Sequence, residues 1–137
     1  LFFGLDFVGK KKEGATLKHL IQSEFWSRTS SFDAGGDDRH ELGCYVYYQY
    51  GFTKDWALGA RLDYFTDLSR KDFFGNSLEY YDLRGILSLT YQPSEFLRFK
   101  LNYSYGTEML DSTELKATNQ VELQVTFNLG AHPAHDF

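Results

Sequence analysis

The feature that most constrains the fold of this chain is an alternation of apolar and polar residues with a period of two. It is clear in the last stretch, residues 119–137. One parity there carries Val121, Leu123, Val125, Phe127 and Leu129, and the other carries Glu122, Gln124, Thr126 and Asn128. Successive side chains of a β-strand point to opposite faces. The pattern therefore predicts a strand with one face in an apolar medium and one face in water.

The same alternation recurs along the whole chain. It predicts seven strands, at residues 1–8, 17–28, 44–52, 56–66, 79–91, 97–105 and 119–137. Aromatic residues make up 18% of the sequence and there are only 2 prolines, a balance that favours strands. No apolar run approaches the ~20 residues of a membrane-spanning helix. We therefore expect one all-β domain over residues 1–137, an antiparallel meander.

The expected connections alternate between short and long. The short ones are residues 9–16, 53–55 and 92–95, and the long ones are 29–43, 67–78 and 106–118. Transmembrane β-barrels have short periplasmic turns and long extracellular loops. A soluble up-and-down barrel also alternates, but its apolar face points inward. Against that reading, the polar parities carry closely spaced opposite charges and the strands reach ten or more residues.

Aromatic residues are predicted near both ends of the strands. Beside the short turns lie Tyr50, Phe52, Trp56, Tyr91 and Phe96, and beside the long loops lie Phe25, Trp26, Tyr64, Phe65, Tyr103 and Tyr105. Two aromatic belts around an aliphatic band are what two membrane–water interfaces require. The sequence thus predicts an antiparallel transmembrane β-barrel, with the apolar parity facing lipid and the polar parity facing a water-filled interior.

The number of expected strands is odd. If the last strand ends in the periplasm, the first must start outside, whereas bacterial single-chain barrels normally have an even number of strands. An open edge in lipid leaves backbone groups without partners. We therefore expect this stretch to be the C-terminal part of a larger barrel, or to close against another chain. No leader is visible in residues 1–9, so we expect the N-terminus to be processed or to lie elsewhere.

Charge and cysteine content narrow the function classes. The net charge of −5 implies no general attraction to nucleic acid. The single cysteine, Cys44, excludes an internal disulfide framework and falls on the apolar parity of its strand. No nucleophile motif and no phosphate-binding glycine-rich loop is present, so we expect no enzymatic activity.

The charged residues on the polar parity are the main functional candidates. The residues predicted to line the interior are Glu24, Arg28, Arg61, Asp63, Asp82, Arg84, Arg98, Lys100 and Glu122. In a wide barrel such groups set the field that a permeating solute meets. In a narrow barrel they would form a salt-bridged plug, and the protein would be an anchor or scaffold. Between residues 56 and 105 four of them are basic and two acidic, which favours a mild anion preference.

The histidines raise a metal hypothesis. His132 and His135, with Asp136 beside them, are ligand types that suit Zn²⁺. Residues three apart in an extended strand point to opposite faces, although Pro133 could bend the backbone. We favour the alternative, a C-terminal assembly signal at the periplasmic rim. The acidic segment with Asp33, Asp37, Asp38 and Glu41, which also contains His40, does not match an EF-hand and is expected to be a solvated loop.

Two segments carry a family resemblance. They are Leu89-Thr90-Tyr91-Gln92-Pro93-Ser94-Glu95-Phe96-Leu97-Arg98 and Phe127-Asn128-Leu129-Gly130-Ala131-His132-Pro133-Ala134-His135-Asp136-Phe137, with weaker similarity at 20–26. They resemble a family of Gram-negative outer-membrane proteins described as porin-like or zinc-regulated. The terminal Phe137 is similar to the assembly signal of outer-membrane barrels. The resemblance implies a longer barrel with strands before Leu1.

These observations together give a functional expectation. The main hypothesis is a porin-like channel for passive passage of small solutes in the bacterial outer membrane, with a periplasmic C-terminus and extracellular long loops. The expected partners are outer-membrane lipid and lipopolysaccharide, and the barrel assembly machinery through the C-terminal strand. The alternatives are the C-terminal wall of an active receptor for a metal or metal complex, which needs an upstream plug domain, and a non-conducting structural barrel.

Overall fold

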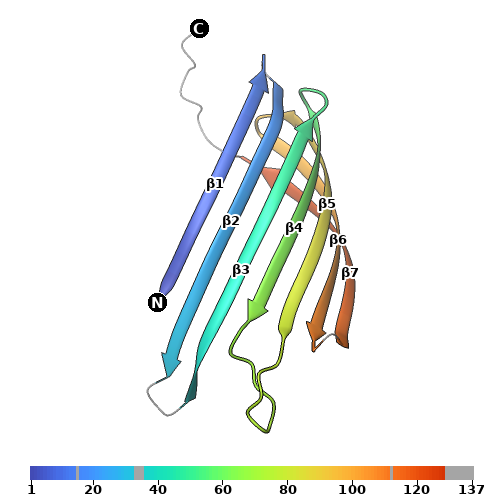
Figure 1. Ribbon diagram of the computed structural model, residues 1–137. Coiled ribbons are helices and arrows are strands. Elements are labelled where there is room, and N and C mark those ends of the chain that lie inside the picture. Colours follow the sequence, from blue (N-terminus) through green and yellow to red (C-terminus); the bar gives the residue numbers. More distant parts are fainter. Residues whose placement is uncertain (15, 33–35, 112, 129–137) are drawn as a thin grey trace.

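The chain folds into a single β-sheet. The computed structural model describes residues 1–14, 16–32, 36–111 and 113–128. Within those ranges it contains seven strands and no helix (Figure 1). The strands are β1 (Phe2–Glu13), β2 (Thr16–Phe32), β3 (Gly36–Gly51), β4 (Trp56–Asp67), β5 (Tyr80–Ser94), β6 (Leu97–Leu110) and β7 (Thr113–Phe127). The predicted all-β meander is confirmed.

Each strand pairs antiparallel with the next one along the chain. The sheet order is β1-β2-β3-β4-β5-β6-β7, so β1 and β7 are the two edges (Figure 1). Within the described residues β1 and β7 do not pair with each other. We call the end with the connections after β1, β3 and β5 the turn end, and the end with the connections after β2, β4 and β6 the loop end.

The strand register sorts the side chains onto two faces, because residues directly opposite each other in neighbouring strands share a face. One row of partners runs from Phe25 through Cys44 and Tyr64 to Leu83. A second row on the same face lies four residues nearer the turn end in each strand. It contains Tyr48, Ala60, Leu87, Tyr103 and Val121. We call the face with these rows the apolar face and the opposite one the polar face. The residues of the predicted apolar parity lie on the apolar face, and the charged residues of the predicted polar parity lie on the polar face.

The apolar face has no protein layer against it in the described part of the chain. Leu87 is 62% exposed and Val121 70% exposed, while among the residues that the structure describes the buried hydrophobic ones are Tyr47 and Ala57. A contiguous apolar surface of this kind marks contact with another protein or with a membrane. The sheet therefore needs an apolar medium on this side. No helix among the described residues is long and apolar enough to cross a membrane.

Three predicted connections were too long. Residues 9–16 were expected to be a connector, but β1 continues to Glu13. Most of 29–43 and 106–118 is also strand, because β2, β3, β6 and β7 extend as paired ladders beyond the apolar rows. Of the predicted long loops, the one at 67–78 is close to the observed segment between β4 and β5, and the predicted turn at 53–55 agrees with the connection between β3 and β4. The polar composition of the extended segments suggested loops. The backbone hydrogen bonds between adjacent strands do not depend on the side chains, so the strands continue through polar sequence.

The predicted aromatic belts need one correction. Trp26 and Phe65 were assigned with Phe25 and Tyr64 to a membrane-interface belt. In the register, Trp26 is opposite Gly43, and Gly43 is opposite Phe65, on the polar face. Both residues share the parity of charged neighbours in their own strands, so they belong to the polar side of the sheet.

Candidate functional site: the polar face of the sheet

The polar face carries every one of the nine charged residues predicted to line an interior. Register rows join Glu24 through Tyr45 to Asp63 and Arg84, and Arg61 lies one row nearer the turn end. The remaining pairs on this face are Arg28 with Glu41, Phe65 with Asp82, Arg98 with Thr126, Thr90 with Lys100 and Asn102 with Glu122. Their assignment to a lumen stays a prediction, but the sheet does bring them onto one surface.

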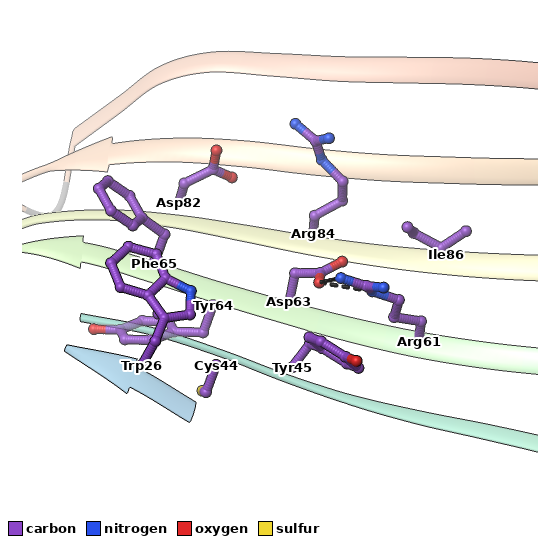
Figure 2. Close-up of a pocket in the computed structure, with 11 residues that line it drawn as sticks. Trp26, Cys44, Tyr45, Arg61, Asp63, Tyr64, Phe65, Asp82, Arg84 and Ile86 are labelled. Atoms are coloured by element: carbon purple, nitrogen blue, oxygen red, sulfur yellow. Dashed lines mark hydrogen bonds and ion pairs between the residues drawn. The ribbon is translucent and has the colours of Figure 1, made fainter. Parts of the chain in front are cut away.

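The central feature of this face is an ion pair within β4. Arg61 Nη2 lies 2.6 Å from Asp63 Oδ1, and Arg61 Nε donates a hydrogen bond to the same oxygen at 2.7 Å (Figure 2). The guanidinium carbon also lies 3.8 Å from the centroid of the Tyr45 ring. A cation over an aromatic face is attracted by the ring quadrupole. Arg61 is thus held in place by two neighbours.

A second ion pair joins β2 and β3 nearer the loop end. Arg28 lies directly opposite Glu41, and Arg28 Nη2 is 2.5 Å from Glu41 Oε2. The Glu41 side chain is only 9% exposed, whereas that of Arg28 is 53% exposed. Glu41 was expected in a solvated loop, so its role was missed. The parity of β3 would have placed it on the polar face had the strand been extended.

Three of the predicted basic residues of this face have no such partner among the described residues, Arg98 and Lys100 towards the turn end and Arg84 opposite Asp63 nearer the loop end. Lys100 Nζ is 5.4 Å from the centroid of the Tyr47 ring. Within the described ranges, Arg84, Arg98 and Lys100 have no carboxylate oxygen within 4.0 Å. Since salt bridges neutralise the charge that a solute meets, these three cations contribute more to the local field than Arg61 or Arg28.

The polar face contains hollows among the described residues, of which two are bordered by the charged residues. The smaller, of about 180 Å³, is bordered by Arg61, Lys100, Ser88 and Asn102, and Asn102 Oδ1 is a buried acceptor with no partner among the described residues. The larger, of about 380 Å³, combines three aromatic side chains, Trp26, Tyr45 and Phe65, with Arg61, Asp63, Asp82 and Arg84 (Figure 2). Sequence reasoning missed the aromatic part, although the parity of Trp26 with Glu24 and Arg28 pointed to it.

The metal hypothesis has no support in the described part of the chain. No group of three or more His, Cys, Asp and Glu side chains gathers there. His19 lies on the apolar face, where its Nδ1 is 2.8 Å from the Tyr48 hydroxyl, and His40 Nδ1 is 3.2 Å from Thr29 Oγ1. His132, His135 and the assembly-signal residue Phe137 lie outside the described residues, so zinc binding there stays a prediction.

Comparison with known proteins agrees with this architecture. The sequence model of one protein family, described as "Putative beta-barrel porin-2, OmpL-like", matches residues 3–132. No curated protein and no solved structure matches the chain. The match covers nearly the whole sheet and agrees with the porin-like resemblance of the chain's last third. The chain therefore belongs to the β-barrel porin-2, OmpL-like family, whose porin-like barrels imply an outer-membrane location.

Proposed function

We propose that this chain forms part of the wall of a porin-like channel through which small solutes pass passively. The single observation that carries the proposal is the division of one sheet into two faces. One face presents large exposed apolar side chains, and the other carries the nine charged residues predicted for an interior, Glu41 in addition, and two hollows. A transmembrane barrel needs such a division, because lipid lies outside it and water inside.

The proposal includes an orientation in the membrane. The apolar face contacts lipid, including the acyl chains of lipopolysaccharide. The turn end faces the periplasm and the loop end faces the medium, since outer-membrane barrels have short periplasmic turns and longer outer loops. The segment between β4 and β5, which contains the exposed Phe73 and Phe74, is then extracellular. The C-terminal strand and Phe137 are proposed to engage the barrel assembly machinery.

Closure of the barrel requires partners for β1 and β7. In an antiparallel sheet of seven strands the two edge strands run in the same direction. Antiparallel closure therefore needs an odd number of additional strands, because unpaired backbone groups in lipid cost several kcal/mol each. We propose that strands upstream in the same protein supply them. A second copy in the same orientation would have to pair β7 with β1 in parallel.

A non-conducting barrel is the second candidate, and the ion pairs favour it. Arg61 with Asp63 and Arg28 with Glu41 are the start of a network that could fill a narrow interior. The unpaired Arg84, Arg98 and Lys100 favour the channel, because a closed plug would leave their charges uncompensated. An active receptor for a metal or metal complex would need a plug domain upstream.

The test is electrical. Full-length protein purified from outer membranes is reconstituted into planar bilayers in potassium chloride, with the heat-unfolded sample as control. The channel proposal expects discrete conductance steps that the unfolded control does not give. Sealed bilayers, from protein that still migrates as a folded barrel in gel electrophoresis, would favour the non-conducting barrel.

A further inference from the structure

The larger hollow on the polar face has a composition that the passage of small solutes does not by itself require. It lies where β2 to β5 approach the loop end, and Figure 2 shows Trp26 and Phe65 on one side of it and Arg61 paired with Asp63 on the other. We propose that this hollow is a subsite for a neutral pyranose sugar. The inference rests on the proposed channel and names a substrate class for it.

The aromatic side is built as a platform. The Trp26 and Phe65 ring centroids are 5.9 Å apart, and the Trp26 and Phe2 centroids 6.2 Å apart. Phe65 is in turn 6.2 Å from Tyr80, so the aromatic row crosses the sheet from β1 to β5. Aromatic faces carry partial negative charge, and they attract the weakly positive C–H groups on the flat face of a pyranose ring.

Gly43 explains how the platform is held. Trp26 extends over this glycine of the neighbouring strand, and a Cβ at position 43 would be 2.5 Å from Trp26 Cζ2 and Nε1. No real Cβ atom sits so close to another atom. The missing side chain therefore lets the indole lie against the β3 backbone. A ring lying on the sheet in this way turns its other face towards the interior.

The charged side supplies hydrogen-bond groups for hydroxyls. Arg61 and Asp63 form a fixed donor–acceptor pair, and Asp82 and Arg84 follow each other along the same face of β5 (Figure 2). Guanidinium and carboxylate groups donate to and accept from neighbouring sugar hydroxyls, and such charge-assisted bonds are the stronger ones. Pockets of a few hundred Å³ with an apolar lining and a few polar groups hold small molecules.

The charge balance favours a neutral ligand over an ion. Two arginines and two aspartates border the hollow, so its formal charge is zero, and Arg61 and Asp63 already neutralise each other at 2.6 Å. Of the three unpaired cations only Arg84 borders the hollow, together with Asp82 of the same strand face, whereas Arg98 and Lys100 do not border it. A purely apolar ligand would desolvate the four charged groups and offer no hydrogen-bond partner to Asp82 or Arg84, which is costly. A sugar satisfies both sides of the hollow.

The experiment measures the ionic current of the full-length protein in planar bilayers while glucose is added, with sorbitol as the matched probe. Sorbitol has the hydroxyls of glucose but no ring. We expect glucose to reduce the conductance in a saturable manner, and sorbitol to reduce it only in proportion to solution viscosity. Equal, non-saturable effects of both solutes would overturn the proposal, as would saturable block by phenylalanine and not by glucose, which would indicate a zwitterion site.

Two glycine variants test the platform without touching a charged group. Gly43→Ala should displace Trp26 and raise the half-blocking glucose concentration about tenfold, the effect of losing one stacking contact. Gly85→Ala is the control, because a Cβ there meets no atom within 4 Å. Trp26→Leu, which keeps Gly43, should reproduce the loss if Gly43→Ala does not assemble. Unchanged glucose block in both Gly43→Ala and Trp26→Leu would contradict the proposal.

The sugar subsite and the channel can fail separately. If the protein gives no conductance, the proposed function fails, and equilibrium dialysis of labelled glucose against the detergent-solubilised protein still tests the subsite. Saturable binding that Trp26→Leu weakens would support it, and the absence of binding would refute it. Conductance without sugar block would leave the channel standing and remove the subsite.

Discussion

Arg28 and Glu41 lie directly opposite each other in β2 and β3, and the arginine covers a carboxylate whose side chain is only 9% exposed. The pair joins β2 and β3 on the polar face near the loop end, in a segment where the sequence suggested a solvated loop. The geometry makes Glu41 dependent on its partner, because a buried charge without a partner keeps its full desolvation cost.

Removing the arginine should therefore destabilise the protein. Arg28→Ala is expected to lower the free energy of unfolding, measured by urea titration of the full-length protein in liposomes, by about 1–3 kcal/mol. The double variant Arg28→Ala with Glu41→Gln should recover part of the loss, because the neutral amide is cheaper to bury. Equal stability of the wild type and Arg28→Ala would show that the pair contributes nothing.

The inside–outside assignment predicts an asymmetry between neighbouring strands. Leu101 lies on the apolar face between Leu89 and Leu123, whereas Gln120 lies on the polar face opposite Ser104. Leu101→Arg should cost roughly 2–4 kcal/mol if the position is near the bilayer midplane, and Gln120→Arg should cost little. The measurement is the free energy of unfolding in liposomes. Normal stability of Leu101→Arg would reverse the assignment of faces.

The unpaired basic residues predict a mild preference for anions. In full-length protein, the combined change Arg98→Gln with Lys100→Gln should shift the reversal potential in a potassium chloride gradient towards cation selectivity, because two uncompensated positive charges are removed from the polar face. Lys54→Gln, in the exposed turn between β3 and β4, is the control for charge outside the interior. An identical reversal potential in all three proteins would mean that Arg98 and Lys100 do not face the permeating ions.

The segment between β4 and β5 predicts a pH effect. Asp72 accepts hydrogen bonds from the Asn76 side-chain amide and from the backbone amides of Asn76 and Phe74, each at 2.8 Å. These bonds, the Asn76 side chain first, hold the pKa of Asp72 below its ordinary value of 3.8. Because the folded pKa is lowered, the ordering is present above the ordinary value and is lost as the pH falls through the lowered one. Carboxyl NMR of the Asp72 side chain should give a midpoint below 3.8, and a midpoint at or above that value would show that the turn is not formed in solution.

The two faces of the sheet could be predicted from sequence because the period of two is a local property. The alternation around Leu58 and Leu62, or Val121 and Leu123, needs no knowledge of neighbouring strands to assign a face. The apolar parity, the strand number and the charged residues of the polar face followed from it. These are the parts of the fold that one strand determines by itself.

The strand ends and the pairings could not be predicted in this way. The segment around His40 and Glu41 is polar, so its composition resembled a loop, but it is paired to Thr29 and Arg28 across a hairpin. Contacts such as Arg28 with Glu41 depend on the register between two strands, which composition does not specify. Trp26 was assigned to an aromatic belt because it is close to a predicted loop. Its position in the alternation, shared with Glu24, already indicated the polar face.

The central claim is that the polar face lines a water-filled channel while the apolar face meets lipid. Adjacent residues of β6 test it most directly, because Asn102 and Leu101 have opposite facings in the same strand. Each is replaced by cysteine in full-length protein free of other cysteines, and a membrane-impermeant thiol reagent is added during conductance recording. Asn102→Cys should be labelled with a change in conductance, and Leu101→Cys should not react. Faster labelling of Leu101→Cys, or labelling of Asn102→Cys that leaves the conductance unchanged, would contradict the claim.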